Sequence, residues 1–102
     1  MNKSQKQIDA WFKEKNWPYW TPHEILARLV EEVGELARLV NHEYGPKKKK
    51  PSEAEQNIED EVGDVLYALA CLANTHDIDL DEALQKSISK VESRDKSRFD
   101  KE

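Results

Sequence analysis

Two short stretches of the sequence carry pairs of carboxylates at the same spacing. Glu32 and Glu35 are three residues apart, and so are Glu61 and Asp64. In an α-helix, residues three apart lie on one face and can reach the same ligand. Carboxylate oxygens are the ligands that Mg²⁺ prefers, and Mg²⁺ usually keeps waters that a phosphate can replace. The spacing therefore indicates a Mg²⁺ site, with Mn²⁺ as a substitute, that takes a phosphate-bearing substrate.

Both pairs lie in or beside the apolar faces of their helices. On a helical wheel Glu32 falls between Ile25 and Leu39. Glu61 likewise falls between Val65 and Ala68. Burial of unpaired carboxylates is strongly unfavourable, so a cation has to compensate for it. Salt bridges to the basic residues near the C-terminus are one solution, but a metal is favoured because every member is an acid and none is His or Cys.

The elements that must position these acids are helices. The sequence predicts helices over residues 4–15, 22–44, 52–75 and 79–98. The last three each begin with a capping-box signal, namely Thr21 with Glu24, Ser52 with Glu55 and Asp79 with Glu82. No segment alternates with period two, so strands are not expected. The expected fold is all-α, with residues 1–102 forming a single domain.

The two acidic stretches echo each other, since residues 31–36 and 60–65 both carry acids around a glycine. A glycine inside a helix costs up to about 1 kcal/mol relative to alanine. We therefore expect Gly34 and Gly63 to allow a close approach of the two helices at the acids.

The motif Glu31-Glu32-x-x-Glu35, followed after 25 residues by Glu61-x-x-Asp64, resembles the signature of the MazG-type nucleotide pyrophosphohydrolases. The likeness extends over about 17–98. Proteins of this family are all-α enzymes that cleave nucleoside triphosphates between the α and β phosphates, giving the monophosphate and pyrophosphate. The resemblance implies the same Mg²⁺-dependent reaction on NTPs or dNTPs here, as housekeeping of the nucleotide pool.

The resemblance also implies roles for particular residues. Glu32, Glu35, Glu61 and Asp64 would bind Mg²⁺. Glu31 or one of these four would accept the proton of the attacking water, and the sequence does not choose among them. The chain would assemble as a homodimer or a dimer of dimers, with four-helix bundles completed between subunits.

Cations and aromatic residues outside the motif are candidates for substrate contacts. Lys86, Lys90 and Arg94 are spaced by four along the last helix and could bind the phosphates, although a solvated or ion-paired face is the alternative. Trp17 and Trp20 could stack on a nucleobase. For these two tryptophans, packing in the core or between subunits is the favoured interpretation.

The composition limits the classes of partner. The 102 residues include 16 basic and 21 acidic side chains, and the formal charge of −5 argues against binding to a nucleic-acid polymer. No apolar run is long enough for a membrane span, no signal peptide is expected, and the single Cys71 fits a reducing cytoplasm. With 37% hydrophobic and 36% charged residues the core is small, which favours a partner subunit.

Two other functions compete with hydrolysis. A non-catalytic helical adaptor would use the acids for ion pairs with the last helix. A di-iron carboxylate bundle would need Glu-x-x-His pairs, and neither acidic stretch has one.

Overall fold

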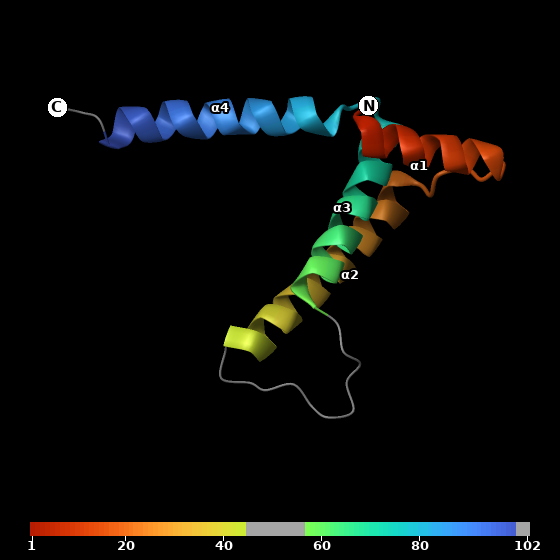
Figure 1. Ribbon diagram of the computed structural model, residues 1–102, viewed down its shortest axis with the longest axis horizontal. Helices are drawn as coiled ribbons and strands as arrows, with labels where there is room; N and C mark the ends of the chain where they lie inside the picture. Colours follow the sequence, from red (N-terminus) through yellow and green to blue (C-terminus); the bar gives the residue numbers. More distant parts are fainter. Residues whose placement is uncertain (45–56, 100–102) are drawn as a thin grey trace.

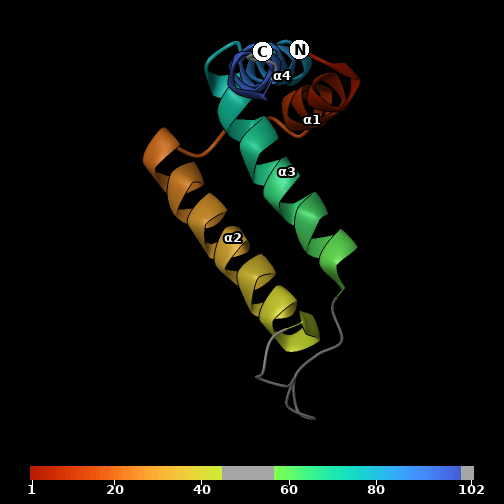
Figure 2. The same cartoon turned by 90° about the vertical axis from the view of Figure 1, so that its left-hand side faces the viewer.

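The structure is a computed structural model that describes residues 1–44 and 57–99, with side chains described up to residue 95. The described residues form helices and no strands: α1 (Lys3–Glu14), α2 (Pro22–Tyr44), α3 (Ile58–Thr75) and α4 (Leu80–Phe99). This confirms the predicted all-α class. Helices α2 and α3 run antiparallel side by side, and α1 lies against the C-terminal end of α3 (Figures 1 and 2). From that junction α4 extends away from the α2–α3 pair (Figure 1).

The start of α2 follows the predicted capping box. The backbone N–H of Glu24 donates to Thr21 Oγ1 at 3.3 Å, and the backbone N–H of Thr21 donates to Glu24 Oε1 at 3.0 Å. At the start of α4 the backbone N–H of Glu82 donates to Asp79 Oδ1 at 3.1 Å, as predicted. These side chains satisfy N–H groups that have no partner inside the helix.

The other two helix starts differ from the prediction. The capping signal at Ser52 and Glu55 lies outside the described residues, and α3 begins at Ile58, where Asn57 accepts a hydrogen bond from the backbone N–H of Asp60 at 2.7 Å. Helix α1 begins one residue earlier than expected because Asn2 forms a capping box with Gln5.

Two helices end in left-handed turns without glycine. Asn16 and Asp77 have φ values of 56° and 53°, and each directly follows the C-cap residue of its helix, Lys15 for α1 and His76 for α3. The following N–H groups reach back, from Trp17 to the carbonyl of Phe12 and from Ile78 to that of Ala73, both at 2.9 Å. This is the Schellman arrangement, and Asn and Asp tolerate the left-handed conformation better than most other residues. The first turn directs the aromatic segment 17–20 back along α3, and the second sets the direction of α4.

Helix α2 has two apolar sides, and the residues that the structure describes cover only one of them. The inner seam packs on α3 and consists of Ile25, Leu29, Glu32, Leu36 and Leu39. The outer seam is exposed and consists of Leu26, Val30, Val33, Ala37, Val40 and Tyr44. On a helical wheel drawn from the sequence of α2, the apolar arc is centred on Leu26, and Ile25 and Leu39 lie at the edge of that arc. The structure reverses that order, since Ile25 and Leu39 are buried and Val30 is 64% exposed.

A buried polar junction fixes α1 against α3. The side chain of Gln5 is fully buried, and its Nε2 donates to Asn74 Oδ1 at 2.9 Å and to the carbonyl of Ile78 at 2.7 Å. Its Oε1 accepts from the backbone N–H of Leu80 at 2.8 Å. Gln5 thus joins three helices, because α4 begins at Leu80. No local pattern in the sequence predicts this junction, because Gln5 and Asn74 are 69 residues apart.

No helix in the part of the chain that the structure describes is both long and apolar enough to cross a membrane.

Candidate active site

Three of the predicted acids converge where α2 packs on α3. Glu32, Glu61 and Asp64 each offer a carboxylate oxygen, and these oxygens lie within 4.8 Å of one another. Glu32 lies on the inner seam of α2, so packing brings it to α3. Glu61 is only 2% exposed, whereas Asp64, one turn further along α3, is exposed. We call these three residues the acid cluster.

The acid cluster has the donor chemistry of a site for a hard cation. All three members offer oxygen, and carboxylate sets suit Mg²⁺, Ca²⁺ and Mn²⁺ rather than the softer transition metals. Carboxylates gathered this closely repel one another, and the repulsion grows as water is excluded around Glu61. A divalent cation would remove that repulsion, so the residues present fit the predicted Mg²⁺.

The remaining acids of the motif lie outside the cluster. Glu35 is half-buried, and its Oε2 is 2.8 Å from Nη2 of Arg38 on the same helix. Glu31 is exposed. The structure therefore brings together three of the four predicted ligands, and a ligand role for Glu35 remains a prediction.

The two glycines of the motif do not mark a close approach within the chain. A Cβ atom added to Gly34 or to Gly63 would meet no described atom within 4 Å. The expectation that they let α2 and α3 approach closely is therefore wrong for the chain by itself.

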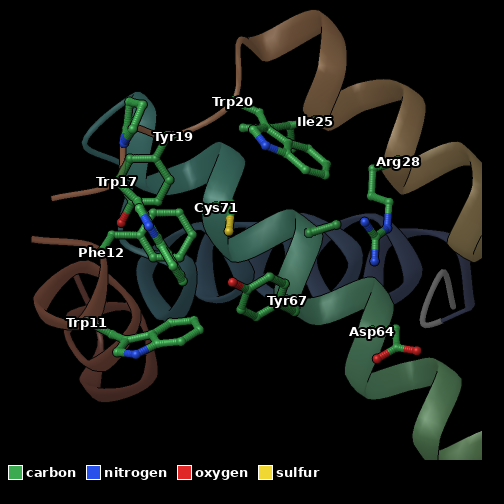
Figure 3. Close-up of a pocket in the computed structure, with 12 residues that line it drawn as sticks. Trp11, Phe12, Trp17, Tyr19, Trp20, Ile25, Arg28, Asp64, Tyr67 and Cys71 are labelled. Atoms are coloured by element: carbon green, nitrogen blue, oxygen red, sulfur yellow. The ribbon is translucent and has the colours of Figure 1, made fainter. Parts of the chain in front are cut away.

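A cavity of about 500 Å³ has Asp64 of the acid cluster in its lining (Figure 3). Asp64 is therefore shared by the cavity and the acid cluster, whereas the lining includes neither Glu32 nor Glu61. Arg28 and Asp64 lie at one end, and Trp11, Phe12 and Trp17 lie at the other (Figure 3). We call this cavity the aromatic pocket, and its lining consists of Trp11, Phe12, Trp17, Pro18, Tyr19, Trp20, Ile25, Arg28, Asp64, Tyr67, Ala68 and Cys71.

Aromatic contacts build the wall that α1 and the segment after it contribute. Trp11 and Trp17 meet edge to face, with ring centroids 5.1 Å apart, and Phe12 stacks on Tyr19 at 4.7 Å. Both predicted base-stacking residues, Trp17 and Trp20, line the pocket and are about half exposed. Trp11 also lines the pocket, although it is not among the residues predicted to stack on a base. The signal in the sequence for an aromatic wall is the high density of aromatic residues on both sides of Pro18.

Tyr19 is tied to the polar junction. Its hydroxyl donates to Asp9 Oδ1 at 2.8 Å and accepts from Asn74 Nδ2 at 2.9 Å. Burial, with a smaller contribution from Asp9, raises the pKa of Tyr19 to about 12, so the phenol stays neutral. The Gln5 and Asn74 junction therefore holds this wall of the pocket as well as α1.

Cys71 is a small buried side chain in the lining of the pocket. Burial raises the pKa of the Cys71 thiol. A thiol with a raised pKa is a poor nucleophile, which agrees with its interpretation as a packing residue.

Arg28 contacts the site, although a helical wheel of α2 places it on the side toward solvent. Its Nε is 3.1 Å from Glu32 Oε1, and its Cζ is 5.7 Å from the centroid of the Trp20 ring. The signal in the sequence was the spacing of four between Arg28 and Glu32, which favours an ion pair on one helix face.

The predicted phosphate-binding row is not beside the acid cluster within one chain. Lys86, Lys90 and Arg94 are exposed on α4, which extends away from α2 and α3 (Figure 1). The ion pairs of Glu32 and Glu35 are made instead to arginines on α2 itself. For these two acids, the structure shows no pairing with the described side chains of the last helix, which an adaptor would use.

Comparison with known proteins identifies relatives over most of the chain. A family model described as the MazG nucleotide pyrophosphohydrolase domain matches residues 20–99. The uncharacterised protein YpjD of Bacillus subtilis (strain 168) is 46% identical over 99 residues, which cover 97% of this chain and 89% of YpjD.

The chain is also similar in structure to solved crystal structures. The crystal structure of YpjD from Bacillus subtilis, described as a candidate pyrophosphatase, superposes with a TM-score of 0.80 at 44% identity and covers 92% of this chain and 94% of that one. The crystal structure of a Bacillus-conserved MazG protein, described as a nucleotide pyrophosphohydrolase, gives a TM-score of 0.72 at 42% identity, covering 86% and 84%. Helix α1 precedes the residues that the family model matches.

Proposed function

The chain belongs to the MazG nucleotide pyrophosphohydrolase family, and from this premise we propose that it hydrolyses NTPs or dNTPs between the α and β phosphates. The products would be the nucleoside monophosphate and pyrophosphate. The family supports hydrolysis of nucleotides as the general activity. The observation that carries the finer proposal is that Asp64 belongs both to the acid cluster and to the lining of the aromatic pocket.

Because Asp64 is shared by the pocket and the acid cluster, a substrate that spans both is bound in one orientation. Aromatic rings bind the flat face of a nucleobase by stacking, and Trp17 and Trp20 offer half-exposed rings in the pocket. A base between these rings directs its phosphates toward Arg28 and the acid cluster. The reacting bond then lies beside the carboxylates and away from the aromatic end.

Glu32, Glu61 and Asp64, with Glu35 as the predicted fourth ligand, would hold Mg²⁺ or Mn²⁺. When bound, such an ion lowers the pKa of coordinated water and offsets phosphate charge. Glu61 anchors the set because α2 and α3 bury it, whereas exposed Asp64 can adjust to the substrate. The proton of the attacking water passes to a carboxylate of this set or to exposed Glu31 next to it.

A second copy of the chain would complete the site. The outer seam of α2 is exposed, and so is an apolar row on α4 that consists of Leu84, Ile88 and Val91. Burying these faces between copies favours a homodimer or a dimer of dimers. In such an assembly Lys86, Lys90 and Arg94 would approach the acid cluster of a neighbouring chain, where they would bind phosphate. The nucleotide substrate and the free Cys71 both fit the cytoplasm.

One assay tests the reaction. The purified protein is incubated with each NTP and dNTP and MgCl₂, and the products are resolved by chromatography and ³¹P NMR. We expect equal amounts of pyrophosphate and monophosphate, at least tenfold less of both with Glu61→Gln, and no loss with Glu59→Gln, which removes an exposed charge from the same helix. Release of orthophosphate and a diphosphate would contradict the proposed bond cleavage, and absence of turnover with every nucleotide would favour the adaptor.

A further inference from the structure

Arg28 lies where the aromatic pocket meets the acid cluster. Among the described residues that line the pocket only Arg28 and Asp64 carry charge, so Arg28 is its cation. Figure 3 shows the guanidinium and the Asp64 carboxylate at the same end of the pocket. The likeness over about 17–98 spans Arg28, but neither the acidic motif nor the predicted phosphate-binding row includes it.

The contacts of Arg28 hold its side chain at that junction but use only some of the N–H donors of its guanidinium. In the part of the chain that the structure describes, its hydrogen bond and ion pair go to Glu32 alone, through Nε at 3.1 Å. The guanidinium also lies 5.7 Å above the Trp20 ring, within the range of a cation–π contact. A guanidinium has five N–H donors in a planar fork, and such forks bind phosphate oxygens in pairs.

The ion pair between Arg28 and Glu32 can be replaced by other contacts at little cost in stability. The side chain of Arg28 is 49% exposed and that of Glu32 is 14% exposed. Ion pairs spaced by four on a helix and open to solvent contribute little to stability. Glu32 is also a member of the acid cluster, so a cation held there competes with Arg28 for the same carboxylate.

We propose that Arg28 is a substrate-binding residue, paired with Glu32 while the site is empty and transferred to a phosphate of the nucleotide when Glu32 takes its place among the cation ligands. The proposal rests on the proposed function of the site. The Trp20 ring keeps the guanidinium between the base and the phosphates during this exchange. Arg28 thus neutralises phosphate charge from the same chain that provides the acid cluster.

The proposal predicts that loss of Arg28 lowers nucleotide affinity without lowering cation affinity, whereas loss of a merely structural ion pair would lower both. In Arg28→Gln the carboxylate of Glu32 loses its competitor, so Mn²⁺ alone binds as tightly as to the wild type or tighter. The same variant loses a charged partner for phosphate, so nucleotide affinity falls by about tenfold to a hundredfold. Arg28→Lys keeps the positive charge but lacks the planar fork of N–H donors. Its nucleotide affinity should therefore lie between those of the wild type and Arg28→Gln.

Calorimetry on the intact protein measures both effects without relying on turnover. Titration with MnCl₂ gives cation affinity, and titration with the α,β-methylene triphosphates of the four nucleosides, in excess Mn²⁺, gives nucleotide affinity when the bond cannot be cleaved. Lys6→Gln is the matched control, since it removes one exposed positive charge from α1, away from the pocket lining. It should leave both affinities within twofold of the wild type.

Three results would overturn the proposal. Parallel loss of Mn²⁺ and analogue affinity in Arg28→Gln, with a lower melting temperature, would assign Arg28 a structural role. Unchanged affinity of Arg28→Gln for the analogues would show that Arg28 does not bind the phosphates. A wild type that binds none of the analogues would overturn this proposal together with the proposed function. A wild type that binds analogues through Arg28 but hydrolyses no nucleotide would refute the reaction and leave Arg28 as a binding residue.

Discussion

Nε2 of Gln5 lies 2.9 Å from Oδ1 of Asn74, and both side chains are buried although they are 69 residues apart in the sequence. This hydrogen bond belongs to a chain of contacts that continues from Asn74 to the hydroxyl of Tyr19 and on to Asp9. It therefore connects the packing of α1 to the wall of the aromatic pocket.

Replacing Gln5 by Leu should destabilise the fold by about 2–3 kcal/mol. The change leaves Asn74 Oδ1 and the N–H of Leu80 without their present partner, and a buried group left unsatisfied costs about 1–3 kcal/mol. Urea denaturation followed by circular dichroism measures the loss. Gln7→Leu, at an exposed position of the same helix, is the control and should stay within about 0.5 kcal/mol of the wild type. An unchanged midpoint in Gln5→Leu would mean that the junction does not fix α1.

Glu61→Gln should reduce Mg²⁺-dependent hydrolysis by at least about tenfold, the loss typical of a weakened ligand set. In buffer without metal the same variant should melt at the same temperature or higher, because removing one charge relieves repulsion within the acid cluster. Turnover and thermal melting are measured on the same preparations. A protein held together by ion pairs of Glu61 would instead melt at a lower temperature, and full activity would remove Glu61 from the site.

Trp20→Ala should raise KM for the nucleotide about tenfold and change kcat less, because stacking on one base contributes about 1–3 kcal/mol. Trp20→Phe keeps an aromatic face and should recover most of the affinity. Steady-state kinetics separates the two constants, with circular dichroism as a check on helix content. Equal KM values for Trp20→Ala and the wild type would assign Trp20 to packing alone.

The phenol of Tyr19 should ionise only well above pH 10. Its pKa is raised to about 12, mainly by burial, so the folded protein keeps this proton when the unfolded chain, with a pKa near 10, has lost it. The resulting stability is fully present below about pH 10 and is lost as the pH rises toward 12. Ultraviolet titration of phenolate in the wild type and in Tyr19→Phe identifies the late step. If the variant lacks a step near pH 10 instead, Tyr19 is not held by Asp9 and Asn74 in solution.

Val30→Glu should dissociate the assembly. Val30 lies in the exposed outer seam of α2, and a charge there opposes burial against a second copy. Light scattering should give at least a dimer for the wild type and a mass near 11.9 kDa for the variant, and the melting temperature of the wild type should rise with protein concentration. Ala27→Glu, exposed on α2 but outside the outer seam, should remain assembled. A monomeric wild type with full activity would refute the assembly and leave the acid cluster untouched.

Most of the secondary structure could be read from the sequence, because its signals are local. The capping box of Thr21 and Glu24 and the cap at Asp79 depend on residues three positions apart. The pairing of Glu61 with Asp64 on one helix face has the same origin, since helix geometry alone places residues three apart together. The start of α3 was missed because Asn57, a weaker signal without a capping-box partner, provides the cap.

The sequence by itself determined the helices, the acid pairs and the excess of apolar surface for one chain. Only the tertiary structure decided that Glu32 rather than Glu35 meets Glu61 and Asp64, that Ile25 rather than Leu26 is buried, and that Arg28 faces the pocket. Periodicity fixes which residues share a face of a helix, but a wide apolar arc permits several rotations of that helix against its neighbour. The rotation that forms is selected by contacts between residues distant in the chain, such as Gln5 with Asn74, and no local pattern encodes them.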